Sequence, residues 1–197
     1  MNRVAIELDE VLFPFIRPMV KHFNKTIPKE VNSCRQRYVY KELLNVDESM
    51  CRKMIRDYSE SEKFPMIQPT IGSQPILRLL RHRFDKIYIV SERPQYMREI
   101  TEDWVNFHYP GIFDDIIFTN NYMNYRELEK YDVCKGLNLD TLIDDDEIDC
   151  AVCLHGGMNV IHFAGDNGKV YPWSRYDQWS VLSWGDLYGR IDKIKIV

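Results

Sequence analysis

The stretch that decides the fold is VAIELDEVL, residues 4–12. Aliphatic and β-branched residues run directly into acidic ones, which is typical of a buried strand that carries polar groups to the edge of a sheet. Glu7 and Asp9 stand two positions apart, so on an extended segment both carboxylates point the same way. We therefore predict a strand over residues 3–8 with a carboxylate pair at its end.

The rest of the chain repeats this pattern of short apolar runs separated by helical ones. Helical periodicity follows Ser73 as far as Phe84, follows Pro94 as far as Tyr109, and marks a closing helix from Val181 to Ile191. Such alternation predicts a Rossmann-like α/β fold, with a parallel sheet of about five strands and helices on both faces. The further strands are expected at residues 86–90, 115–118, 140–143 and 158–163, with another helix over 147–155.

One segment does not alternate in this way. Residues 13–72 are rich in helical signals and have no convincing strand pattern. We interpret 13–72 as a helical cap inserted in an α/β core made of residues 1–12 and 73–197. Such a cap would cover the edge of the sheet at which ligands bind in open α/β folds.

Composition narrows the class of protein. A chain of 197 residues with 45% hydrophobic residues can bury the core of one domain. A net charge of −4, with both signs mixed along the chain, argues against binding duplex nucleic acid or an anionic membrane. We see neither a signal-peptide pattern nor a run of roughly 18 apolar residues, so we expect a cytoplasmic protein. The sequence leaves a homodimer open.

Five cysteines include a CxxC pair, Cys150 and Cys153. Only His155 and Cys134 could complete a metal site, and their spacing is not that of a recognised one. Ordinary packed thiols are the preferred interpretation, with zinc or redox chemistry as the alternative.

Polar side chains at the carboxyl ends of parallel strands should meet at one edge of the sheet. The carboxylates among them suit Mg²⁺, and a hydroxyl, backbone N–H groups and a lysine suit a phosphate. Each group also has a structural interpretation, since the acidic run could cap the next helix, the serine could be a cap and the lysine could be solvated. The candidates are Glu7, Asp9, Ser91, Glu92, Asp144 and Asp145, with Lys135 nine positions ahead of Asp144.

Taken together, these residues resemble the four motifs of the haloacid dehalogenase-like (HAD) phosphohydrolase superfamily. The motifs are an apolar strand ending in DxD, a strand ending in Ser or Thr, a lysine, and a strand ending in an acidic pair. They correspond here to VAIELDEVL, IYIVSERP, Lys135 and TLIDDD, and the resemblance covers essentially the whole chain. The insertion after the first motif and the stretches IVSERP and VIHFAGDN look most like the 5′(3′)-deoxyribonucleotidase branch.

The resemblance implies a two-step phosphoryl transfer with Mg²⁺ as cofactor and a small phosphorylated substrate, such as a nucleotide. Glu7 would hold the position of the nucleophile and Asp9 that of the acid and base. Ser91, Glu92 and Lys135 would contact the phosphoryl group. Mg²⁺ would be bound by Glu7, Asp9, Asp144 and Asp145.

The chain departs from the family pattern at its most sensitive residue, because the family nucleophile is Asp and here it is Glu7. The extra methylene moves the carboxylate by about 1.5 Å, and a misplacement of about 1 Å can cost on the order of 10²-fold in rate. Glu10 is a second departure, since many relatives have Gly there. The sequence favours a Mg²⁺-dependent phosphatase, with a pseudoenzyme that binds ligand without turnover and a purely structural α/β protein as the alternatives.

Overall fold

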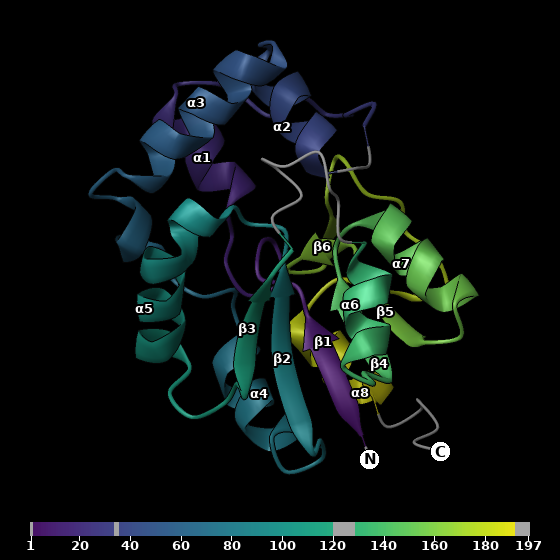
Figure 1. Cartoon of the computed structure of the whole chain (residues 1–197). Helices are drawn as coiled ribbons and strands as arrows, with labels where there is room; N and C mark the ends of the chain where they lie inside the picture. The colour runs from purple at the N-terminus through teal and green to yellow at the C-terminus, as the bar shows by residue number, and fades with distance from the viewer. Residues whose placement is uncertain (1, 34–35, 120–128, 192–197) are drawn as a thin grey trace.

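The computed structural model describes residues 2–33, 36–119 and 129–191, and its centre is a parallel sheet (Figure 1). The strand order is β3-β2-β1-β4-β5-β8, and each neighbouring pair is parallel. This confirms the predicted α/β, Rossmann-like fold. The strands are β1 (Arg3–Ile6), β2 (Lys86–Ser91), β3 (Asp115–Phe118), β4 (Thr141–Asp144), β5 (Asn159–Phe163) and β8 (Ser180–Val181).

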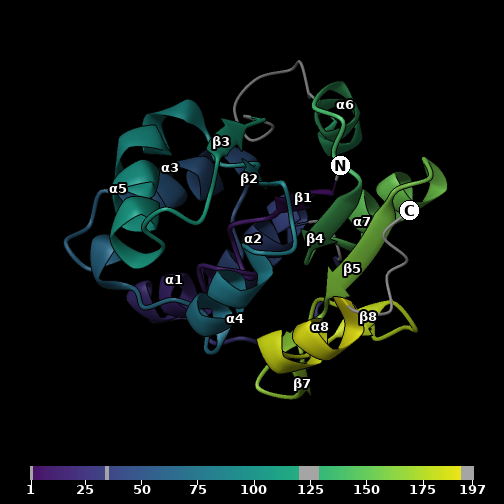
Figure 2. The ribbon, with the colours of Figure 1, turned by 90° about the horizontal axis from the view of Figure 1, so that it is seen from below.

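Helices cover both faces of the sheet, as predicted (Figure 2). Alternate residues of β1 point to opposite faces of the sheet, and each face has its own core. Val4 and Ile6 belong to a large core that includes residues of α4, α5 and α8. Ala5 belongs to a smaller core with residues of α6 and α7. These helices are α4 (Ser73–Leu80), α5 (Arg98–His108), α6 (Lys130–Gly136), α7 (Glu147–His155) and α8 (Trp184–Ile191). A 3₁₀ turn, η2 (Gln95–Met97), leads into α5.

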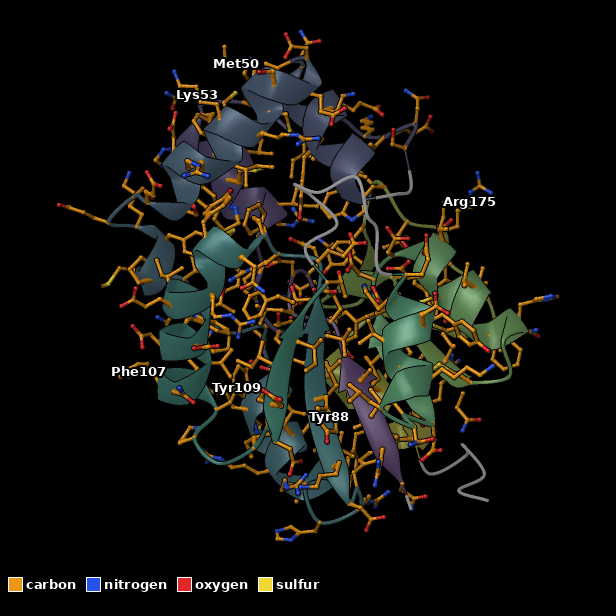
Figure 3. All side chains as sticks on the ribbon, viewed as in Figure 1. Met50, Lys53, Tyr88, Phe107, Tyr109 and Arg175 are labelled. Atoms are coloured by element: carbon orange, nitrogen blue, oxygen red, sulfur yellow. The ribbon has the colours of Figure 1, made fainter. Side chains whose placement is uncertain are left out.

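The segment between β1 and α4 is helical in the part that the structure describes. Helices α1 (Ile16–His22), α2 (Gln36–Leu44) and α3 (Glu48–Ser59) lie together beyond the carboxyl ends of the strands (Figure 1), and η1 (Phe64–Met66) follows them. Met50 and Lys53 project outward from α3 (Figure 3), so the opposite side of this helix, with Ile55 and Tyr58, is the buried one. This arrangement is consistent with a cap, although the exact boundaries at residues 13 and 72 stay a prediction.

The end of the chain differs from expectation at one element. We predicted that the closing helix starts at Val181, but Val181 lies in the sixth strand, β8, and α8 starts at Trp184. The backbone of this stretch pairs with β5, since Ala164 N donates to Val181 O at 3.0 Å. Pairing with β5 satisfies backbone groups that an early helical turn would leave without partners.

A small hairpin has its turn at Asn167 and Gly168. Strands β6 (Gly165–Asp166) and β7 (Lys169–Val170) are antiparallel. Asn167 and Gly168 both have positive φ, at 50° and 77°, as a tight two-residue turn between strands requires.

The CxxC pair lies in α7 with both side chains buried. Burial raises the pKa of the Cys153 thiol to about 12 and that of Cys134, on the neighbouring helix, also to about 12. Within residues 2–33, 36–119 and 129–191, His, Cys, Asp and Glu form no group of three or more that could hold a metal ion. The burial of these thiols agrees with their packing in the core.

In the same described part of the chain, no helix has the length and apolar character needed to cross a membrane.

A buried histidine joins β5 to the segment that contains β8. His162 Nδ1 is 3.0 Å from Ser180 Oγ, and its Nε2 is 3.0 Å from Ser174 Oγ. Burial lowers the pKa of His162, although the negative charges of Asp177 and Glu147 oppose this shift. The folded state thus favours the neutral imidazole.

We predict that His162 makes the protein less stable in mild acid. Because its pKa is lower in the folded state than in the unfolded state, the unfolded chain binds more protons as the pH falls below about 6.5, and stability is lost there at up to about 1.4 kcal/mol per pH unit. Urea unfolding between pH 7.5 and 5 should show a smaller loss for His162→Gln than for the wild type. His82→Gln, at an exposed position, should retain the wild-type slope. Equal slopes in all three proteins would contradict this role.

Candidate active site

The candidate site lies where the strand order reverses, at the carboxyl ends of β1 and β4. Glu7 directly follows β1 and donates its backbone N–H to Ile143 O of β4 at 2.9 Å. Asp144 ends β4 and Ser91 ends β2, and all three side chains are buried. The sheet therefore brings together the three strand-end positions that the sequence singled out, at the place where open α/β sheets bind ligands.

A buried lysine holds these strand ends together. Lys130, the first residue of α6, is 2% exposed. Its Nζ lies 2.8 Å from Glu7 Oε2, 2.5 Å from Asp144 Oδ2 and 2.9 Å from Asp149 Oδ2. Burial would lower the pKa of Lys130, but the three carboxylates more than offset it and hold the pKa well above the ordinary value. Lys130 thus remains charged inside the protein.

The prediction that Lys135 belongs to this site is wrong. Lys135 is exposed, donates from Nζ to Tyr131 Oη at 3.1 Å, and lines a cavity of about 460 Å³ with residues such as Asn2 and Asn159 at the opposite end of the strands. Residues five apart on a helix point about 140° apart, so Lys130 and Lys135 cannot face the same site. The position of a lysine along the helix could have identified Lys130. A helix that leads into a parallel strand starts near the carboxyl ends of the strands, so a lysine in its first turn is nearest the site.

The Glu7 carboxylate folds back onto its own loop. Oε1 accepts hydrogen bonds from Leu8 N at 2.8 Å and Asp9 N at 3.3 Å, and Oε2 faces Lys130. Both oxygens of the residue in the nucleophile position are therefore engaged.

Asp9 is held by an arginine that the sequence analysis did not include among the site residues. Arg93 Nε lies 3.1 Å from both carboxylate oxygens, and Nη2 lies 2.6 Å from Oδ1. Burial raises the pKa of Asp9, and the charge of Arg93 opposes that rise. The motif IVSERP contains Arg93, so its place two residues after Ser91 was the available signal.

Arg93 is itself fixed on its other sides. Its Nη1 donates to Thr101 Oγ1 of α5 at 2.9 Å, and its guanidinium carbon lies 4.3 Å from the ring centre of Phe13 and 5.2 Å from that of Phe64. These contacts are cation–π interactions in a desolvated site, where such contacts are strongest. They link Asp9 to α5 and to the segment that carries α1–α3.

Ser91 and Glu92 lie beside this network. Ser91 is fully buried, and its Oγ accepts from Arg93 N at 3.3 Å. Burial raises the pKa of the half-buried Glu92 to about 7, against the effect of the Lys130 charge. Contact of either residue with a phosphate stays a prediction.

The three consecutive aspartates have separate tasks. Asp144 Oδ2 contacts Lys130, and Oδ1 accepts from Asp146 N at 2.9 Å. Asp146 caps α7, because its Oδ1 accepts from Ile148 N at 2.8 Å and Asp149 N at 3.2 Å. The helix-cap interpretation therefore holds for Asp146 alone.

Three site carboxylates have an oxygen without a hydrogen-bond partner among the described residues; those of Glu7 and Asp149 still contact Lys130, whereas that of Asp145 has no such ion pair. Asp145 is 3% exposed, and its Oδ1 has no hydrogen-bond partner among the described residues. Burial, followed by the charges of Asp144, Glu10 and Glu7, raises the pKa of Asp145 well above its ordinary value. A cation at this oxygen would relieve both the desolvation and the repulsion.

Glu10 turns away to anchor α1. Its Oε1 accepts from Phe15 N at 2.8 Å and Ile16 N at 2.5 Å, and its backbone oxygen accepts from Tyr171 Oη at 3.0 Å. Its φ of 61° lies in the left-handed region that favours glycine. Glu10 therefore has a structural task in this chain, and its side chain is tied to the start of α1.

Of the four predicted metal ligands, the structure leaves Asp145 with an open oxygen. Both oxygens of Asp9 are bound by Arg93, and those of Asp144 by Lys130 and Asp146 N. The described residues thus offer Asp145, with the charge of Glu7 beside it, as the place for a hard cation.

Comparison with known proteins points to one fold. No family model matches the sequence, and no curated protein matches it either. Solved structures do match. One, described as a predicted phosphatase from Clostridium acetobutylicum, has a TM-score of 0.68 at 18% identity, covering 98% of this chain and 99% of that one. L-2-haloacid dehalogenase from Xanthobacter autotrophicus has a TM-score of 0.61 at 14% identity, covering 98% and 99%.

A third match is the 2-haloacid dehalogenase from Pseudomonas syringae, with a TM-score of 0.54 at 14% identity, covering 98% of this chain and 99% of that one. This chain has the haloacid dehalogenase-like fold. The fold agrees with the superfamily resemblance of the sequence motifs, while the identities are too low to carry over an activity. Chemistry has to be argued from the site itself.

We predict that Arg93 is a main source of stability. Arg93→Met removes one partner of a buried ion pair and should lower the free energy of unfolding by about 3–5 kcal/mol, as measured by urea denaturation. Arg98→Met is the matched control, because Arg98 forms an ion pair with Glu102 in which both side chains are about two-fifths exposed (42% and 41%); its loss should cost under about 1 kcal/mol.

The double variant Asp9→Asn/Arg93→Met should lose less than the two single losses added together, because neither charge is then left alone. A loss for Arg93→Met no larger than that for Arg98→Met would contradict the assignment.

Proposed function

We propose that the protein is a Mg²⁺-dependent phosphomonoester hydrolase of the HAD type, acting on a small phosphorylated substrate. The observation that carries this proposal is the buried Lys130, which contacts Glu7 and Asp144 across the β1–β4 junction. A buried ammonium at the carboxyl ends of β1 and β4 is suited to holding a phosphoryl oxygen when one of its three carboxylate partners gives way. A nucleoside monophosphate is the leading candidate substrate, from the resemblance to the deoxyribonucleotidase branch.

The proposal requires a cation, and the donor set suits one. The unpartnered Asp145 Oδ1 is a buried, hard oxygen donor, and its neighbours Glu7 and Glu10 add negative charge. Asp145 would hold Mg²⁺, and so would Glu7 once one of its oxygens leaves its present partners, with the remaining positions taken by water and substrate oxygens. The metal would supply positive charge that stabilises the transferring phosphoryl group.

The side chains of the chain divide the remaining tasks. Lys130 and the Ser91 hydroxyl would orient the phosphoryl oxygens. Asp9 would give a proton to the leaving oxygen and later take one from the water that hydrolyses the phosphorylated Glu7, for which one Asp9 oxygen must leave its present hydrogen bonds to Arg93. Glu7 would attack phosphorus, for which one oxygen must leave its present hydrogen bonds to Leu8 N and Asp9 N.

A second candidate function is binding of a phosphate ligand without turnover. The engaged state of Glu7 favours it, because both carboxylate oxygens already have partners. In this case the fold and the lysine would serve recognition, and the missing aspartate at position 7 would explain the lack of catalysis.

One experiment separates the two candidates. We expect the wild type to hydrolyse p-nitrophenyl phosphate and at least one nucleoside monophosphate with Mg²⁺ and not with EDTA. Glu7→Asp restores the usual length of the nucleophile and should raise the rate by on the order of 10²-fold. Activity in Glu7→Asp alone would favour the binding function, and a lack of activity in both proteins would refute a hydrolase.

The two lysines provide a matched control. Lys130→Met should lower kcat by on the order of 10²–10³-fold because it removes a charge from the transition state. Lys135→Met should retain wild-type activity, since Lys135 lies at the other end of the strands. Circular dichroism melting checks that Lys130→Met is folded, and Asp9→Asn serves as a second inactive variant if it is not. Equal losses in both lysine variants would contradict the site.

A further inference from the structure

The loop after β1 presents two successive backbone N–H groups to one acceptor. Leu8 N and Asp9 N both donate to Glu7 Oε1, at 2.8 and 3.3 Å. Leu8 is fully buried and Asp9 is 5% exposed, so water cannot easily replace this acceptor. Successive N–H groups pointing at one place form a small concave site that favours an anion.

Lys130 faces the other oxygen of the same carboxylate, with Nζ 2.8 Å from Glu7 Oε2. Ser91 lies nearby, since Leu8 and Ser91 are each two positions beyond the paired residues Ile6 and Ile89 of β1 and β2. The two N–H groups and the ammonium, which also contacts Asp144 and Asp149, therefore surround the Glu7 carboxylate, which is part of the chain itself.

An ion pair with Lys130 alone would not place Oε1 on the backbone. The observed position uses the length of glutamate, which extends the carboxylate about 1.5 Å further from the Cα atom than aspartate does. Oε1 and Oε2 are both occupied by donors that would otherwise be open to a ligand. The substitution at position 7 thus changes which group fills this site.

We propose that the Glu7 carboxylate occupies an oxyanion site formed by Leu8 N–H, Asp9 N–H and Lys130, and that it competes there with an external phosphate or similar tetrahedral oxyanion. Glu7 then acts as a built-in occupant that limits phosphate binding. This inference rests on the proposed function, which places a phosphate site at the carboxyl ends of β1 and β4. It concerns binding alone and needs no metal.

The test is binding of inorganic phosphate, measured by isothermal titration calorimetry in EDTA. Glu7→Ala empties the site and leaves the three donors in place. Glu7→Gln removes the same charge but keeps a side chain of the same size, with an oxygen that can still accept from the two N–H groups. We expect Glu7→Ala to bind phosphate at least about tenfold more tightly than Glu7→Gln or the wild type, because hydrogen bonds from charged or buried donors become available to the ligand.

Glu42→Ala is a matched control elsewhere in the chain. Glu42 also accepts backbone N–H groups, from Asn32 at 2.8 Å and Ser33 at 3.1 Å, but it is only partly buried and these contacts involve no buried lysine. It should gain no phosphate binding. Glu7→Ser is the second variant to use if Glu7→Ala does not show a cooperative melt.

Equal gains in Glu7→Ala and Glu7→Gln would show that charge alone is responsible and would overturn the inference, as would no gain in Glu7→Ala. The result is independent of the hydrolysis assay with Mg²⁺. Hydrolysis by the wild type without a gain in Glu7→Ala refutes the built-in occupant and leaves the hydrolase standing. A gain in phosphate binding in Glu7→Ala without hydrolysis by the wild type supports the built-in occupant and counts against the hydrolase.

Discussion

The candidate site depends on how carboxylates are kept charged or neutral inside a protein. Glu7, Asp9, Asp144 and Asp149 are all nearly inaccessible to water, and an unpaired buried charge costs several kcal/mol. Lys130 contacts three of them and Arg93 contacts the fourth. Because each cation comes from a different helix or turn than the carboxylates it meets, α6 and the turn after β2 must pack against the loop after β1 before the charges can be buried.

The parts of the site that the sequence predicted are those fixed by the backbone. Parallel strands carry the residues at their carboxyl ends to one edge whatever the details of packing, so the positions of Glu7, Ser91 and Asp144 followed from the strand pattern. Lys130 and Arg93 could not be found in this way. Which lysine of a short helix faces the site depends on where the helix starts and on its rotation, and neither is written in a local pattern.

Side-chain partners decided the rest. From sequence, Asp9, Asp144 and Asp145 are equivalent carboxylates for a metal, but hydrogen bonding gives each a different environment. The same holds at the end of the chain, where Val181 suits either a helix or a strand. Pairing with β5, a contact between distant parts of the sequence, decides in favour of the strand.

Glu10 has a consequence for how the helical segment can move. Its carboxylate accepts hydrogen bonds at the first turn of α1, and its backbone oxygen accepts one from Tyr171. Two residues further on, Leu12 O accepts from Thr70 N at 2.9 Å, and Thr70 lies at the other end of the helical segment. A helix can move as a unit only if at least one of the segments that flank it is free, and here buried hydrogen bonds hold the chain at Glu10 and at Leu12. The start of α1 is therefore fixed relative to the loop after β1, and a rigid-body movement of this helix would have to break these buried hydrogen bonds.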